Sequence, residues 1–179
     1  MISVIDTPNP DTKKFQFEKS IVCEGTKEFK KGEQSDLDLV SSLFGLGSVE
    51  LIFFDKDFIS IRKNKDVIWE AEIQKILEQL NKHIDQNFVP LNFKEESQFE
   101  DDISKRIEEV LNEKIRPAVA MDGGDIRLNS YKDGVAEVML KGACAGCPSS
   151  TVTLKHGVER MIKHYVPEVN SVEAINIDE

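Results

Sequence analysis

Two cysteines spaced three positions apart are the residues of this 179-residue chain best suited to chemistry. They lie in the segment Cys144-Ala145-Gly146-Cys147-Pro148, between a predicted strand and a predicted helix, so both thiols can bind one centre. Pro148 suits the first turn of a helix, where its missing N–H is not needed. Cys147 would then lie at the helix N-terminus, whose partial positive charge favours the thiolate that binds metals.

The pair is compatible with three chemistries, of which the first is dithiol redox catalysis. Thioredoxin-like sites usually place an aromatic residue before the first cysteine, within a βαβ context. Here Gly142 and Ala143 precede Cys144, and Pro148 follows the second cysteine instead of lying between the two. The local sequence therefore disfavours a thiol–disulfide oxidoreductase, which is kept as the alternative function.

A zinc site, the second possibility, requires four ligands. Beyond the pair, the chain offers Cys23, His83, His156 and His164. His156 lies nine residues after Cys147, so a straight helix places it roughly 10 Å away, and His164 lies about two turns further on. Neither histidine can readily join the pair within one chain, which disfavours an intrachain zinc site.

An iron–sulfur cluster, the third possibility, is normally held by four thiolates. One chain supplies two well-placed cysteines, so two chains are needed. A symmetric homodimer in which each copy contributes Cys144 and Cys147 would complete the ligand set. An incompletely enclosed site at such an interface would favour release of the cluster over permanent redox service.

The spacing of apolar residues predicts the elements of the first half. The predicted strands are Lys14–Phe17, Val49–Phe54 and Phe58–Arg62. Ser35 followed by Asp38 resembles a capping box, which predicts the start of a helix that runs to about Phe44. Apolar residues from Trp69 to Ile84 recur on one face of a long amphipathic helix.

The second half is predicted to follow the order α-β-β-α-β, with the cysteine loop between the second strand and the second helix. The segments are a helix at Ile103–Leu111, strands at Ile126–Tyr131 and Val135–Lys141, a helix at Leu154–Tyr165 and a strand at Val172–Ile177. The first of these helices is expected to stop before Pro117, because the residue before a proline disfavours helical geometry.

A stretch rich in acidic residues, with no helical or alternating period, separates the two halves. We therefore predict an α+β fold of two small α/β-sandwich-type domains. The first domain is expected at residues 1–90, an acidic linker at residues 91–102 and the second domain at residues 103–179.

Three further features have a functional and a purely structural interpretation. Cys23 stands alone and is expected to be a small buried apolar residue. Trp69 opens a helix on its apolar face, which favours packing in the core. The Asp-Gly-Gly-Asp segment at residues 122–125 could be only a polar turn, or it could lie beside the cysteine loop and shape its surroundings.

Composition argues against several classes of function. The chain carries 23 Lys plus Arg against 33 Asp plus Glu, so it lacks the basic field that binds DNA or RNA. No apolar run approaches the roughly 18 residues of a membrane span, and the N-terminus does not resemble a signal peptide. Three cysteines are too few for a disulfide framework. We therefore expect a reducing compartment: a bacterial cytoplasm, with the mitochondrial matrix as the alternative.

The chain resembles a known family in both halves. Residues 142–155, together with Ile115-Arg116-Pro117 and residues 122–125, are similar to the C-terminal domain of NifU, the Nfu family. Thr7-Pro8-Asn9-Pro10, Lys14-Phe15, Leu43-Phe44 and Asp57-Phe58-Ile59 resemble the Nfu N-terminal domain. The N-terminal assembly domain and the central ferredoxin-like domain of full NifU have no counterpart here, so the short Nfu architecture is expected.

This resemblance implies an iron–sulfur cluster scaffold or carrier, not an enzyme. Such a protein receives a [4Fe–4S] cluster from an assembly scaffold and passes it to apo-proteins. The resemblance carries over Cys144 and Cys147 as the cluster and metal ligands, shared between the subunits of a homodimer, whereas Cys23 matches no motif. Two departures from the family pattern, Ala145-Gly146 between the cysteines and Asp36 before the first helix, leave the ligands untouched.

Overall fold

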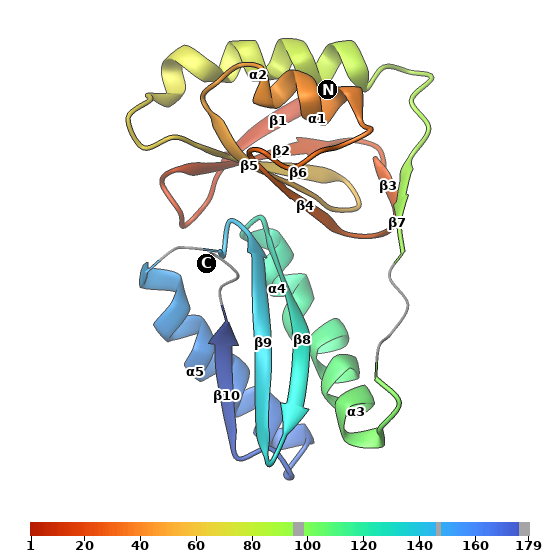
Figure 1. Ribbon diagram of the computed structural model, residues 1–179, viewed down its shortest axis with the longest axis vertical. Coiled ribbons are helices and arrows are strands. Elements are labelled where there is room, and N and C mark those ends of the chain that lie inside the picture. The colour runs from red at the N-terminus through yellow and green to blue at the C-terminus, as the bar shows by residue number, and fades with distance from the viewer. Residues whose placement is uncertain (95–98, 146–147, 176–179) are drawn as a thin grey trace. The chain divides into compact units, whose positions relative to one another are not determined.

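The chain divides into two compact units, Met1–Glu95 and Glu96–Glu179 (Figure 1). The computed structural model describes residues 1–94, 99–145 and 148–175, without the side chains of residues 148–154. Each unit combines a sheet with helices, which confirms the predicted α+β class. No helix in these described ranges is both long enough and apolar enough to cross a membrane.

The first unit is built on a five-stranded antiparallel sheet in the order β1-β2-β6-β5-β4. Its strands are β1 (Ile2–Asp6), β2 (Thr12–Phe17), β4 (Lys27–Lys30), β5 (Val49–Phe54) and β6 (Phe58–Lys63). Helices α1 (Asp38–Phe44) and α2 (Trp69–His83) lie against one face of this sheet (Figure 1). The structure confirms the strands predicted around residues 14–17, 49–54 and 58–62, and the long helix that begins at Trp69.

The core of the first unit lies between this sheet face and the two helices. Alternate strand residues point toward the helices, and one stripe of each helix points back. Fully buried members include Phe15, Ile52 and Ile59 from the sheet and Leu43, Ile76 and Leu80 from the helices. The β-forming residues of β5 and β6 on either side of a short turn, and the helical spacing of apolar residues in α2, are the sequence signals that made these elements predictable.

A separate two-stranded sheet pairs β3 (Val22–Gly25) with β7 (Leu91–Phe93) in parallel. The sequence prediction assigned residues 91–93 to the linker, whereas the structure places them in this strand. Three residues are too few to show an alternating pattern, and the partner strand lies far away in sequence. The close pairing requires glycine at Gly25, where φ is +79° and a Cβ would lie 2.2 Å from the Phe93 carbonyl oxygen.

The second unit contains a three-stranded sheet in the order β10-β9-β8. Strands β8 (Gly124–Lys132) and β9 (Val135–Gly142) form an antiparallel hairpin, and β10 (Ser171–Ile175) runs parallel to β9. Helices α3 (Asp102–Val110) and α4 (Arg116–Met121) pack against β8, and α5 (Pro148–Tyr165) packs against β10 (Figure 1). The predicted α-β-β-α-β order is confirmed; the predicted end of the last strand, Ile177, lies outside the described residues.

Two predictions about helix ends are wrong. The first helix of the second unit does not stop before Pro117: it continues through a π-helical segment, η1 (Leu111–Ile115), into α4, which begins at Arg116. Pro117 is tolerated because it lies in the first turn of α4, where its missing N–H is not needed. In the first unit, the Ser35 hydroxyl accepts from the N–H of Leu37 at 3.1 Å, and no side chain caps α1 in the manner of a capping box.

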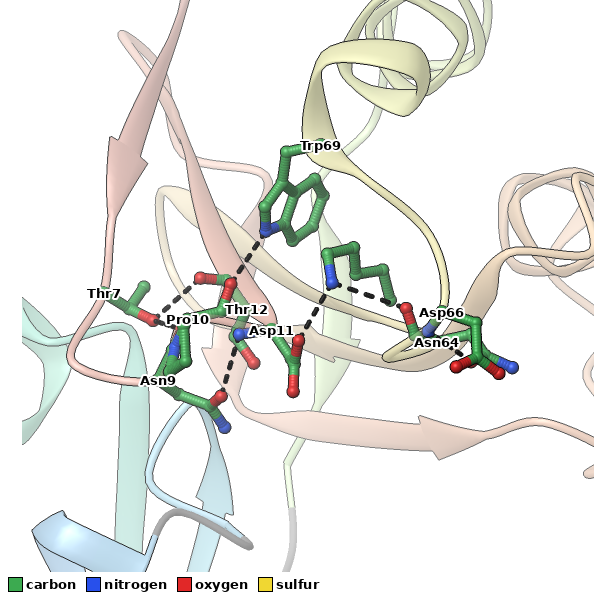
Figure 2. A network of polar contacts seen from close by, with 9 residues as sticks. Thr7, Asn9, Pro10, Asp11, Thr12, Asn64, Asp66 and Trp69 are labelled. Carbon is green, nitrogen blue, oxygen red and sulfur yellow. Dashed lines mark hydrogen bonds and ion pairs between the residues drawn. The ribbon is translucent and has the colours of Figure 1, made fainter.

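A polar network shapes the loop between β1 and β2 (Figure 2). The Thr7 hydroxyl lies 2.9 Å from the Asn9 carbonyl oxygen and 2.8 Å from the Thr12 carbonyl oxygen. The indole N–H of Trp69 donates to the Pro10 carbonyl at 2.9 Å, while the rest of this side chain is buried in the core. The core role predicted for Trp69 is therefore confirmed, and its polar edge also ties α2 to the loop.

Replacing Trp69 by phenylalanine should lower the free energy of unfolding of the first unit by about 1–3 kcal/mol. The Pro10 carbonyl would lose its donor, and the smaller ring would leave space in the core. Urea unfolding followed by circular dichroism measures the effect. Gln74→Ala, at an exposed position of the same helix, should change the same quantity by less than about 0.5 kcal/mol; equal effects of the two substitutions would contradict the assignment.

Glu72 should make the stability of the first unit depend on acid pH. Lys75 and Ser48, at 2.8 Å and 2.6 Å, donate hydrogen bonds to its buried carboxylate and hold the pKa of Glu72 below its ordinary value of 4.5. A lowered folded pKa contributes stability that is complete above 4.5 and is lost as the pH falls through the folded value. Urea unfolding should therefore show a steeper loss of stability, as the pH falls below about 4.5, for the wild type than for Glu72→Gln.

Candidate functional site

Cys144 lies in the turn that follows β9, and its side chain is only 6% exposed. It belongs to the core cluster of the second unit, together with residues such as Ile126 and Val158. Helix α5 begins at Pro148, as the position of this proline predicts. The second predicted ligand, Cys147, and the neighbouring Gly146 lie outside the described residues.

The turn that carries Cys144 is held by backbone hydrogen bonds on both sides of the sulfur. Gly142 has φ +65°, a left-handed conformation that glycine adopts readily, and its carbonyl accepts from the N–H of Ala145 at 3.2 Å. The N–H of Ala143 donates to the Gly123 carbonyl at 3.1 Å. The hydrogen bond of Ala145 thus closes the turn that contains Cys144, and the hydrogen bond of Ala143 joins this turn to the one that precedes β8.

The Asp-Gly-Gly-Asp segment at residues 122–125 lies beside this cysteine turn. Gly123 has φ +82°, which reverses the chain between α4 and β8. At Gly124, an added Cβ would lie 2.5 Å from the Cys144 sulfur and 2.9 Å from the Lys141 carbonyl oxygen. Of the two interpretations that the sequence left open, the structure therefore supports the one in which this segment shapes the surroundings of the cysteine loop.

Asp125 carries the buried charge of this region. Its side chain is 3% exposed, and its Oδ1 and Oδ2 accept from the Arg116 guanidinium at 2.6 Å and 3.0 Å. Arg127 also donates to Oδ2, at 3.2 Å, and the N–H of Ile126 donates to Oδ1 at 2.8 Å. Arg116 reaches back along its helix to the amide oxygen of Asn112 at 2.8 Å.

In the sequence, Arg116 and Asp125 were noted only within motifs that resemble the Nfu family, and no contact between them was predicted. Their pairing spans α4 and the turn at residues 122–125. An arginine just before a proline and an aspartate nine residues later were the available signal. Because such a contact depends on how the helix and the strand fold back on each other, spacing alone does not predict it.

The other candidate ligands lie away from the cysteine turn in sequence and have other surroundings. His156 and His164 are exposed on α5, and the Nε2 atom of His83 lies 3.2 Å from the Ser42 hydroxyl in the first unit. The expectation that Cys23 is a buried apolar residue is wrong, since it is exposed and its thiol donates to the Leu91 carbonyl at 3.2 Å. Strand alternation explains this, because the neighbouring Val22 takes the buried side of β3.

No group of three or more His, Cys, Asp or Glu side chains gathers in a metal-binding arrangement within the described ranges. The described part of the site contains one thiol, that of Cys144, packed against Gly124. The next residue along β8, Asp125, forms an ion pair with Arg116. Once its sulfur is accessible, a thiolate can bind iron or zinc or take part in disulfide exchange.

Two family models match the chain and together span most of it. The model described as "NifU-like domain" matches residues 107–173. The model described as "Scaffold protein Nfu/NifU N terminal" matches residues 2–87. The first match contains the whole region from Arg116 to Cys147, and the second contains the loop of Figure 2.

Several curated proteins are similar along nearly the whole chain. A Drosophila persimilis protein named "NFU1 iron-sulfur cluster scaffold homolog, mitochondrial" is 36% identical over 97% of this chain, which spans 64% of that protein's length. A human protein of the same name is 33% identical over 99% of this chain and 73% of its own length. A crystal structure of the Staphylococcus aureus protein SAV1430 is 28% identical, with a TM-score of 0.40, over 44% of this chain and 96% of that one.

The extent of these matches confirms the resemblance read from the cysteine loop and the N-terminal motif. The human relative exceeds 30% identity across nearly all of this chain, and both domain models match in the expected order. The chain belongs to the Nfu/NifU family.

Proposed function

We propose that this chain is an iron–sulfur cluster scaffold and carrier that holds a [4Fe–4S] cluster on Cys144 and Cys147 and transfers it to apo-proteins. The main support is the named role of relatives that align with nearly the whole chain. The glycines near Cys144 add support, because the absence of a side chain at Gly124 lets the Cys144 sulfur take a defined position beside the backbone of β8. In this role the cluster is cargo, and the chain acts as a carrier instead of turning over a small molecule.

The proposed carrier is a homodimer when it holds the cluster. A [4Fe–4S] cluster normally takes four thiolates, and the proposed ligands supply two in each chain. A two-fold axis through the cluster brings two Cys144/Cys147 pairs together, so that each subunit contributes the same surface. Cys23 is not a proposed ligand, because it matches no motif of the family resemblance.

Transfer is proposed to proceed by thiolate exchange. A client thiolate forms a bond to a cluster iron, the bond from that iron to a carrier thiolate breaks, and the released thiolate takes up a proton. Repetition of this step moves the cluster without a change in its oxidation state. The direction of transfer follows from the client, whose four ligands in one chain enclose the cluster more completely than a shared interface does.

The proposed partners are an assembly scaffold that donates the cluster and apo-proteins that accept it. The proposed compartment is a reducing one, where thiols such as the exposed Cys23 stay reduced. A bacterial cytoplasm and a mitochondrial matrix both meet that condition, and the curated relatives are named as mitochondrial proteins.

Cys144→Ser and Cys147→Ser should each abolish retention of the cluster, because a shared site would lose two of its four thiolates. After anaerobic reconstitution, the wild type should contain about two irons and two acid-labile sulfides per chain and have the native mass of a dimer. Both serine variants should contain almost no iron or sulfide while their circular dichroism spectra stay unchanged.

Cys23→Ser is the matched control and should load like the wild type. Zinc in place of iron and sulfide in the wild type would contradict the proposal. A monomeric, metal-free wild type with a measurable dithiol reduction potential and activity on a protein disulfide would favour the oxidoreductase alternative. A serine variant that still delivered clusters at the native rate would exclude these two ligands.

The first unit is proposed to serve client recognition, so removing it should separate loading from delivery. A chain of residues 96–179 should still assemble the cluster, because both proposed ligands lie in the second unit. Cutting after Glu95 removes β7 together with its partner β3, so the remaining chain retains neither strand of that pair. Cluster transfer from each chain is measured for an apo-ferredoxin, by the absorbance of its rebuilt cluster, and for other apo-clients. With the truncated chain, some of these clients should load more slowly than with the full chain. Equal transfer rates for all clients would contradict this role.

A further inference from the structure

The sulfur of Cys144 occupies space that almost any other residue at position 124 would fill. A Cβ at Gly124 would lie 2.5 Å from the sulfur and 3.0 Å from the Cys144 Cβ. Cys144 is 6% exposed and packs with the core cluster of its unit. In this conformation the first proposed ligand is therefore withdrawn against β8. A shared cluster needs a more accessible sulfur, so the cysteine turn must open before or during loading.

The turn that receives the sulfur is fixed by a forked ion pair. Both carboxylate oxygens of Asp125 accept from Arg116, at 2.6 Å and 3.0 Å. Bidentate pairing of this kind fixes direction as well as distance, because the guanidinium and the carboxylate lie in a common plane. Since Asp125 directly follows Gly124, the pair determines where the start of β8 lies relative to the start of α4.

A second connection transmits this placement to the cysteine turn. The Gly123 carbonyl accepts from the N–H of Ala143, the residue before Cys144. Strand pairing adds to it, because Gly124 lies opposite Gly142 and Asp125 opposite Lys141 in the β8–β9 hairpin. A change in the position of Asp125 would therefore alter the contact between Gly124 and the sulfur.

We propose that Arg116 and Asp125 are positioning residues that hold Cys144 in the withdrawn conformation and thereby set the rate at which its sulfur becomes available to an incoming iron or cluster. The inference rests on the proposed function for its biological meaning. Its physical content concerns the cluster-free chain alone: the pair controls how often the Cys144 turn opens.

The test is the rate at which iodoacetamide alkylates each cysteine in the full-length, cluster-free, reduced chain, resolved by peptide mass spectrometry. Asp125→Asn and Arg116→Gln should raise the rate at Cys144 about tenfold. Arg116→Lys keeps the charge but not the fork and should give an intermediate rate. The rate at Cys23, in the other unit, should stay unchanged in all three variants.

Arg106→Gln is the matched control, because Arg106 forms an ion pair with Glu168 in the same unit at 2.7 Å, with both side chains 42% exposed. It should leave the rate at Cys144 within about twofold of the wild type. An unchanged Cys144 rate in Asp125→Asn and Arg116→Gln, with unchanged melting temperatures, would overturn the proposal. Equal acceleration by Arg106→Gln would also overturn it, since general loosening of the unit would then explain the result.

Gly124→Ala tests the same contact by a steric route. The added methyl group would lie 2.5 Å from the sulfur and 2.9 Å from the Lys141 carbonyl oxygen. It should therefore push Cys144 and the end of β9 away from β8 and accelerate alkylation of Cys144 even with the ion pair intact. A rate equal to that of the wild type would show that the sulfur is not held against β8. Both alkylation results are independent of metal loading, so a wild type that binds no cluster would refute the proposed function and leave this inference to be judged on the alkylation rates.

Discussion

The close approach of the Cys144 sulfur to the backbone of β8 is the constraint on which the second unit depends. It requires a residue without a side chain at Gly124, since a Cβ there would lie 2.5 Å from the sulfur. It also requires a chain reversal at Gly123, where φ is +82°. The β8–β9 hairpin sets the two glycine-containing ends against each other, because Gly124 pairs with Gly142. Gly123, Gly124 and Gly142 together allow the Cys144 sulfur to lie against the start of β8.

The helical segment before this turn is irregular, and its irregularity helps to position Arg116 against the start of β8. The chain passes from α3 through the π-helical η1 into α4 without leaving helical geometry. A π turn inserts an extra residue and so shifts the phase of every later side chain. Arg116 is the first residue after this segment, and its guanidinium reaches both Asn112 and Asp125. Pro117, placed in the first turn of α4, is compatible with this path because it has no N–H to leave unpaired.

Sequence patterns predicted the elements that local spacing determines and missed those that depend on distant partners. Helix α2 carries a clear helical period, and the strands around residues 49–54 and 58–62 are rich in β-forming residues on either side of a short turn. The assignment of Cys144 as a cluster ligand stays a prediction. Strand β7 carries no such signal, because it is short and pairs with β3 across most of the first unit. The Arg116–Asp125 pair lies close in sequence but was also missed, because the contact depends on how α4 and β8 fold back on each other. Cys23 was expected to be buried because isolated cysteines usually are, and no strand was predicted at residues 22–25 from which the direction of its side chain could be inferred.

An ion pair with a buried carboxylate, such as Arg116–Asp125, is poor evidence for stability, because the cost of removing charges from water often equals their attraction. Apolar residues of similar volume could hold α4 against β8 as firmly. What the Arg116–Asp125 pair adds is direction, because a fork that meets both carboxylate oxygens fixes an angle that apolar contacts leave loose. Asp125 is 3% exposed and Arg116 29%, so water competes little for the carboxylate oxygens, whereas the partners of the Arg106–Glu168 pair are each 42% exposed. Burial therefore decides which of these two arginine–carboxylate pairs can control the geometry of a neighbouring thiol.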